Sequence, residues 1–152
     1  MASIRSQILD YVAAKLNGTG KPAGLSVELM RLRNLEEVSL PFNVVRPTGE
    51  EVSMARPDNL RCPVVERSMR FTVDCFAEAG AGQTADDALD ALLVWTTKAI
   101  LADPRMGGLA IHTSEDSTDW EADETAAGTY ARASISFTVR YRTSANDQEA
   151  KA

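Results

Sequence analysis

The chain has 152 residues, of which 44% are hydrophobic and 25% charged, and its formal net charge at pH 7 is −6. This length fits one domain that can bury about 70% of the surface its unfolded chain exposes. The acidic balance argues against a nucleic-acid-binding protein, because such proteins usually have a basic patch or stripe. The arginines are scattered along the sequence and form no such cluster.

The sequence contains no apolar run that approaches the roughly 18 residues needed for a membrane-spanning helix. Its first residues lack the apolar core of a signal peptide, so we expect the protein to begin its life in a cytoplasm. The two cysteines, Cys62 and Cys75, are then expected to be reduced. Two cysteines are also too few to indicate a disulfide framework.

The first predicted element is a helix over residues 4–16. Ser3 is its expected N-cap, and Asn17 followed by Gly18 is its expected end, because glycine tolerates the left-handed conformation of many helix C-caps. Its apolar residues recur at the spacing that forms one stripe on a helix. The predicted stripe consists of Ile4, Ile8, Tyr11, Val12 and Leu16.

The middle of the chain is less regular. Residues 25–33 alternate well enough to predict a strand. Residues 42–45 and 50–53 are predicted to form a hairpin around residues 46–49, where proline and glycine suit a tight turn. Residues 54–63 contain two prolines and are predicted to be a loop. Loops of that length in compact domains are often functional.

A strand and a second helix follow. Residues 67–77 alternate between apolar and polar side chains, which predicts a strand. Thr84 is the expected N-cap of a helix that is stopped by Asp103, and Asp86 and Asp87 in its first turn suit the positive end of the helix dipole. The buried stripe of this helix is predicted to consist of Ala88, Leu89, Leu92, Trp95, Ala99 and Ile100.

The last part of the chain predicts strands over residues 109–120 and 129–143. The second alternates strictly, which indicates one buried and one wet face, as in an antiparallel sheet. Residues 144–152 are polar and are predicted to be a flexible tail after a single domain of residues 1–143. The sequence therefore predicts an α+β fold, with a mostly antiparallel or mixed sheet of about four to five strands and two helices packed on one face.

One glycine-containing turn is similar to a nucleotide-binding motif. Gly80, Gly82 and Ala85 make a G-x-G-x-x-A pattern between a predicted strand and a predicted helix, where a dinucleotide-binding turn occurs. Asp86 and Asp87 stand where a pyrophosphate would dock, and like charges repel there. The neighbouring strands also alternate, whereas a parallel nucleotide-binding sheet has continuously apolar strands. A plain strand-to-helix turn is therefore the preferred interpretation.

An acidic run surrounds a tryptophan near the end of the predicted strand 109–120. It consists of Glu115, Asp116, Asp119, Trp120, Glu121, Asp123 and Glu124. Asp119, Glu121 and Asp123 have the spacing of the first three ligands of a calcium loop. The glycine that such a loop needs next is Glu124, and the acid needed at its twelfth position is Tyr130. Three interpretations stay open: a metal site, a solvated hairpin rim, and a surface that contacts a partner or faces DNA in passage.

Groups able to perform catalysis are scarce in this sequence. His112 is the only histidine, which removes paired-histidine metal sites and leaves any serine or cysteine nucleophile one possible imidazole base. Its place in a predicted strand indicates an ordinary strand residue. We therefore expect no enzymatic activity, no catalytic residue, no bound metal and no cofactor.

The second helix, its Asp103-Pro104-x-x-Gly107-Gly108-Leu109 stop and the two long terminal strands resemble the tail terminator proteins (minor tail or tail completion proteins) of long-tailed bacteriophages. The resemblance implies a structural virion protein, assembled in the host cytoplasm, whose copies join in a hexameric ring at the head-proximal end of the tail. Such a ring caps the tail tube, ends its polymerisation and offers a docking surface to the head completion protein. DNA later passes through its centre, and no catalytic residue is transferred.

A closed ring needs two different patches that meet on neighbouring subunits. The last strand and residues 54–63 are the predicted patches. The acidic run is predicted to face the channel, where carboxylates would oppose adhesion of DNA within a Debye length of roughly 8 Å. Two other functions stay open: a head–tail completion or connector protein, and, from a different class, a small ligand- or nucleotide-binding α+β module.

Overall fold

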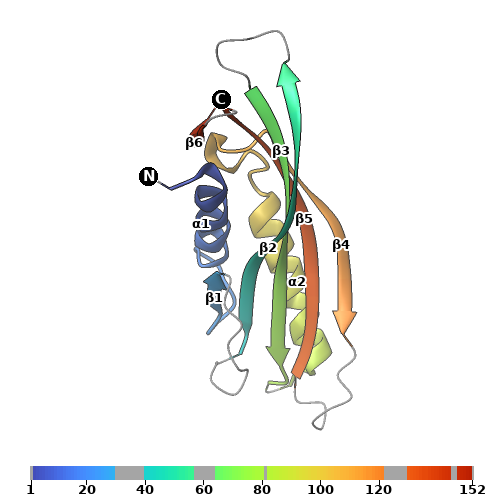
Figure 1. Cartoon of the computed structure of the whole chain (residues 1–152). Coiled ribbons are helices and arrows are strands. Elements are labelled where there is room, and N and C mark those ends of the chain that lie inside the picture. The colour runs from blue at the N-terminus through green and yellow to red at the C-terminus, as the bar shows by residue number, and fades with distance from the viewer. Residues whose placement is uncertain are drawn as a thin grey trace.

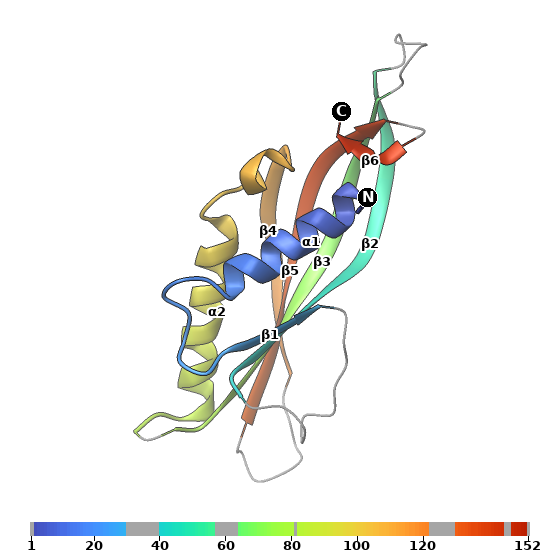
Figure 2. The ribbon, with the colours of Figure 1, turned by 90° about the vertical axis from the view of Figure 1, so that its left-hand side faces the viewer.

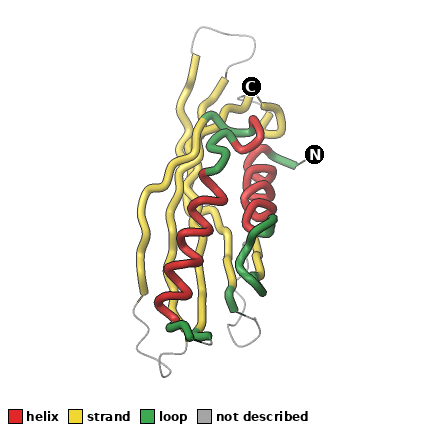
Figure 3. Tube along the Cα trace, turned by 180° about the vertical axis from the view of Figure 1, so that it is seen from behind, coloured by secondary structure: helices red, strands yellow, loops and turns green. Residues whose placement is uncertain are grey.

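The structure, a computed structural model, describes residues 2–29, 40–56, 64–80, 82–121, 130–144 and 147–151. A long twisted sheet forms one layer (Figure 1), and both α-helices lie against the same face of it (Figure 3). The helices are α1 (Ile4–Leu16) and α2 (Ala85–Leu101), and the strands are β1 (Ser26–Leu29), β2 (Phe42–Arg56), β3 (Val64–Glu78), β4 (His112–Glu121), β5 (Tyr130–Ser144) and β6 (Asp147–Lys151). The predicted α+β fold, with two helices on one face of the sheet, is confirmed.

The strand order of the sheet is β1-β2-β3-β5-β4, and β6 pairs with β5. β1 runs parallel to β2, and each of the other pairs is antiparallel, so the sheet is mixed. α1 lies on the side of β1 and β2, whereas β4 forms the opposite side of the molecule (Figure 1). The two sides of the molecule are therefore built from different elements.

The hairpin predicted for residues 42–53 is wrong, because β2 runs through both of its strands and the supposed turn. It pairs with β3 along almost its whole length, with a register shift between Pro47 and Gly49. A shift of this kind absorbs a proline, which cannot donate to the ladder. The predicted loop is also wrong at residues 54–56, which continue β2; residues 57–63 lie outside the described part.

The main core lies between the sheet and the helices. In β5 the alternate residues from Ala133 to Thr143 are buried, as the sequence predicts. Phe71 of β3 stacks on Phe137 of β5 with ring centroids 5.2 Å apart, and both rings are fully buried. The side chains that α1 buries against this layer are Ile4, Ile8, Leu9, Val12 and Leu16.

The buried stripe of α2 is rotated slightly from its predicted position. Thr84 is its N-cap, as predicted, and accepts a hydrogen bond from the backbone N–H of Asp87. The residues that it buries are Ala85, Leu89, Leu92, Leu93, Thr96 and Ile100. Trp95 is only partly buried, because it packs at the edge of the core instead of inside it.

The opposite face of the sheet is not uniformly wet, although strict alternation predicts that. Phe42, Val44 and Phe76 form a second small apolar cluster there. Asp74 beside it is only 1% exposed, and its carboxylate accepts hydrogen bonds from Arg46 Nε at 2.9 Å and from the Ser134 hydroxyl. Burial of this carboxylate is tolerated because both of its oxygens are bonded.

The Asp-Pro-x-x-Gly-Gly segment forms a compact turn after α2. The Asp103 carboxylate accepts hydrogen bonds from the backbone N–H groups of Arg105 at 3.1 Å and Gly107 at 2.8 Å. The hydrogen bond from the N–H of Gly107 is the main cause that lowers the pKa of Asp103, and the hydrogen bond from the N–H of Arg105 acts in the same direction. The backbone then has positive φ at Met106 (50°), Gly107 (66°) and Gly108 (91°). Met106 is fully buried, so its side chain anchors the turn to the core. After this turn, β4 begins at His112, three residues later than predicted.

The last residues also differ from the prediction. Residues 144–152 are predicted to fray, but Asp147–Lys151 forms β6 and pairs with β5. β4 pairs with β5 only as far as Arg140, so the backbone of the end of β5 is open to a further strand. Polar side chains do not prevent such pairing, because the ladder uses backbone groups alone.

Truncation of the stacked ring pair should be strongly destabilising. We expect Phe137→Ala to lower the free energy of unfolding by about 3–5 kcal/mol, since it leaves a cavity in the closed core. Denaturant unfolding measures this loss. Val52→Ala is the control: Val52 is 55% exposed, and its truncation should change stability by less than about 0.5 kcal/mol. Similar losses in the two variants would contradict the described core.

The turn after α2 should reject a side chain at its central glycine. A Cβ at Gly107 would meet only ordinary contacts, the nearest being Tyr11 Cε2 at 3.6 Å, so the strain comes from its positive φ. We expect Gly107→Ala to lose about 1–2 kcal/mol of unfolding free energy. Gly80→Ala is the matched control, because a Cβ there meets open space and no positive φ. Equal thermal stability of both variants would contradict this geometry.

Candidate functional site

The acidic run lies mostly on β4, which is an edge strand of the sheet. β4 stands last in the strand order and pairs with β5. β5 is therefore an interior strand for most of its length, so its backbone is already paired there, and only the outward face of this strand could serve as the predicted patch. Trp120 near the end of β4 is 65% exposed. Asp123 and Glu124 lie outside the described residues.

One part of the run faces the side of the sheet that the helices cover. Residues directly opposite each other in an antiparallel pair share a face. Trp120 lies opposite Ala133, and Glu115 lies opposite Phe137, whose side chain is buried under the helices. Trp120 and Glu115 nevertheless remain exposed, because they are at the edge of the sheet.

The other part of the run faces the opposite side. Glu121 pairs with Arg132, and its carboxylate lies 3.2 Å from the guanidinium. Asp116 accepts a hydrogen bond from the hydroxyl of Thr138. Asp119 lies on the same side as Glu121, two residues along the strand. The run is therefore not one uniform carboxylate surface, and part of it is already bonded to β5.

The structure gives the acidic run an ordinary role as well. An exposed edge strand is a template for unwanted pairing, and charged side chains and bulges are common means of blunting it. β4 has both, since its register shifts between Glu115 and Ser117. Among the described residues there is no cluster of three or more His, Cys, Asp or Glu side chains that could hold a metal ion.

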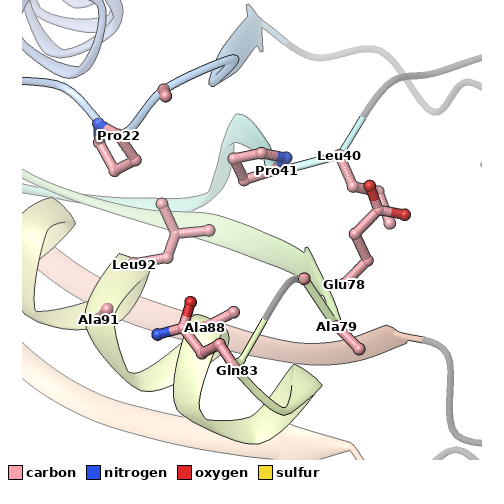
Figure 4. A pocket seen from close by; sticks show the side chains of 11 residues that line it. Pro22, Leu40, Pro41, Glu78, Ala79, Gln83, Ala88, Ala91 and Leu92 are labelled. Atoms are coloured by element: carbon pink, nitrogen blue, oxygen red, sulfur yellow. The ribbon is translucent and has the colours of Figure 1, made fainter.

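The Gly80-x-Gly82 turn lies beside a pocket of about 330 Å³ between α2 and the ends of β2 and β3 (Figure 4). Gly82 has a φ of 76°, and Gly80 forms a bridge with Gln83. The charged side chain among the described lining residues is Glu78. The other lining residues are Pro22, Ala23, Leu40, Pro41, Ala79, Gly80, Gln83, Ala88, Ala91 and Leu92. A phosphate would meet a carboxylate here, so the geometry does not favour a nucleotide.

A wider groove of about 620 Å³ lies between α1 and α2. Its described lining is apolar or small apart from two lysines and a threonine: Tyr11, Ala14, Lys15, Gly18, Thr19, Trp95, Lys98, Ala99 and Ala102. Both lysines are exposed and stand in the last turns of their helices, where they suit the negative end of the helix dipole. Sequence reasoning missed this groove, because it assigned Trp95 to the core.

Cys75 and His112, the described cysteine and histidine, do not form a nucleophile–base pair. Cys75 is buried, and burial raises the pKa of its thiol to about 12, so it stays protonated at neutral pH. His112 is exposed on β4, opposite Arg140. Cys62 lies outside the described residues.

A polar cluster that the sequence did not reveal joins α1 to the sheet. The Glu50 carboxylate accepts hydrogen bonds from Arg5 and from the hydroxyl of Tyr141, and it lies 3.6 Å from the guanidinium of Arg67. Arg67 also donates to the Thr143 hydroxyl at 3.0 Å. The predicted hairpin placed Glu50 beside a turn, so only the true register of β2 brings it to these partners.

Comparison of the chain with known protein families and with curated protein sequences finds no match. Among the described residues, no helix is both long and apolar enough to cross a membrane.

The polar cluster predicts a loss of stability in alkali. Burial raises the pKa of Tyr141 to about 12, and the hydrogen bond to Glu50 acts in the same direction. A tyrosine in the unfolded chain ionises near pH 10, so its contribution is complete below about pH 10 and is lost as the pH rises towards 12. We expect Tyr141→Phe to make the unfolding free energy fall less over that interval. Cys75 is present in both proteins, so its titration affects both pH profiles equally. Parallel pH profiles of the two proteins would therefore contradict a contribution from Tyr141.

Proposed function

We propose that this protein is a tail terminator of a long-tailed bacteriophage. Its copies would close into a hexameric ring at the head-proximal end of the tail. The ring caps the tail tube, ends its polymerisation and gives the head completion protein a docking surface. In this role the protein is a structural component of the virion and acts without a cofactor or catalysis.

The observation that carries the proposal is the order of the elements around the Asp103 turn. α2 ends in this turn, which leads directly into β4, and the long β5 follows. α1 and α2 pack on one face of the mixed sheet. These are the features on which the resemblance to tail terminators rests, and the turn is held by specific hydrogen bonds from Arg105 and Gly107.

The two sides of the subunit also suit a ring. Cyclic assemblies use heterologous contacts, in which one patch meets a different patch on the next copy. One side of this molecule presents the edge strand β4, and the other presents α1 and β1 (Figure 2). The sheet therefore has different surfaces at its two sides, as a head-to-tail arrangement requires.

Passage of DNA needs a surface that does not hold phosphates. On the face opposite the helices, arginines of β5 lie near carboxylates: Arg132 near Glu121 at 3.2 Å, and Arg140 and Arg142 near Glu66 at 3.5 and 3.6 Å. Neutralised arginines attract phosphates less than free ones do. This face is compatible with a channel that DNA crosses without specific binding.

The proposal is tested by assembly in solution. We expect light scattering and negative-stain microscopy of the purified protein to show closed rings. When these are added to growing tubes of the tube protein from the same virus, they should bind at one end and stop elongation. Protein that stays monomeric at high concentration and leaves tube growth unchanged would contradict the proposal.

The same preparation separates the alternatives. Rings that bind emptied heads but not tubes would indicate a head–tail completion protein. A monomer whose melting temperature rises with a nucleotide, and loses that rise in Gly82→Asp, would indicate a ligand-binding module at the pocket in Figure 4.

A further inference from the structure

The exposed tryptophan of β4 and the groove between the helices are two separate surface features of the molecule. Trp120 is 65% exposed, whereas 28 hydrophobic residues are buried in the described part of the chain. Tryptophan is the residue type most enriched at the energetic centres of interfaces. An exposed indole on a strand edge is therefore a candidate anchor for a partner.

The surroundings of Trp120 are acidic. Glu115 shares its face of the sheet, whereas Asp119 and Glu121 flank it in the chain and lie on the opposite face. All three carboxylate side chains are exposed. A surface that receives Trp120 therefore needs an apolar hollow with positive charges near its rim.

The groove between α1 and α2 has those properties. Its floor consists of small and aromatic side chains, and Lys15 and Lys98 bring a positive charge from each helix. The ion pairs given above join carboxylates to arginines. Lys15 Nζ lies 5.4 Å from the centroid of the Tyr11 ring, so its ammonium already has an aromatic partner. Lys98 is exposed in the last turn of α2, and its ammonium can approach a carboxylate or the face of an indole ring from another molecule.

One carboxylate lies close to the groove and is occupied otherwise. Asp103 interacts electrostatically with Lys15, which is one cause of its lowered pKa. Its two oxygens already accept the N–H groups of Arg105 and Gly107 and the hydroxyl of Tyr11. Asp103 therefore reduces the positive charge of the groove at one end without filling it.

We propose that the groove between α1 and α2 binds Trp120 from a second copy of this chain, with the exposed carboxylate of Glu115 on the same face of β4. β4, which carries Trp120, is the edge strand on the side of the sheet away from β1, and α1 lies on the side of β1 (Figure 1). Each copy thus offers a groove to one neighbour and a tryptophan to the other. The inference rests on the proposed ring and identifies the contact that closes it.

Two variants each remove one half of this contact. Trp120→Ala deletes the anchor and keeps the groove. Ala14→Glu adds a carboxylate to the groove and keeps Trp120; Ala14 is exposed inside α1, where glutamate is a good helix former. We expect each variant alone to self-associate at least about 30-fold more weakly than the wild type, the factor expected for loss of an interface hot spot.

Mixing the two variants is the decisive step. The intact groove of Trp120→Ala can receive the intact Trp120 of Ala14→Glu, but the remaining two surfaces are blocked. We therefore expect the mixture to form one-to-one pairs and no larger assembly, as measured by sedimentation velocity. Val94→Glu is the matched control, because Val94 is exposed on α2 outside the groove lining, and its rings should persist.

The outcomes separate this contact from the proposed function. Rings that persist in Trp120→Ala and Ala14→Glu would overturn the contact and leave the ring in place. Loss of rings in both variants without pairs in their mixture would overturn the assignment of one surface to the other. If the wild type stays monomeric, the contact is overturned. If the wild type also leaves tube growth unchanged, the proposed function is overturned as well. Binding of Trp120 or the groove to the tube protein alone would assign them to that partner instead.

Discussion

The antiparallel pairing of β3 with β5 is the constraint on which the rest of the structure depends. The two strands pair from Val64 opposite Ser144 to Glu78 opposite Tyr130 without a register shift. Because side chains alternate, this register sends one set of residues from both strands under the helices and the other set to the opposite face. A slip of one residue would expose the stacked phenylalanines and bury arginines, so the apolar pattern specifies the whole ladder.

This central ladder also decides which surfaces are available to partners. β5 is enclosed between β3 and β4, so the open edge passes to β4, which has a bulge and several carboxylates. The helices stand over the ladder and leave a groove where α1 diverges from α2. Since α1 and β4 lie at different ends of the strand order, the two sides of the molecule present different surfaces, and an assembly that joined one side to the other would be head to tail.

The sequence predicted those parts of the fold in which local and tertiary signals agree. Ser3 and Thr84 cap their helices as expected, and β5 buries the alternate residues that its pattern indicates. β2 could not be predicted, because Pro47 and Gly49, which lie between two strand-like segments, signal a turn as strongly as a bulge. Only the length of β3, which provides partners for both halves of β2, decides between them.

The arrangement of the acidic run could not be read from its spacing. Simple alternation places Glu115, Asp119 and Glu121 on one face of the strand. The register shift between Glu115 and Ser117 moves Glu115 to the helix-covered face with Trp120 and leaves Asp119 and Glu121 opposite. Glu121 is then close to Arg132, whereas the face with Trp120 has no such described ion pair. A single bulge therefore divides the acidic run into a part bonded to its own sheet and a part that a partner can approach without breaking an existing ion pair.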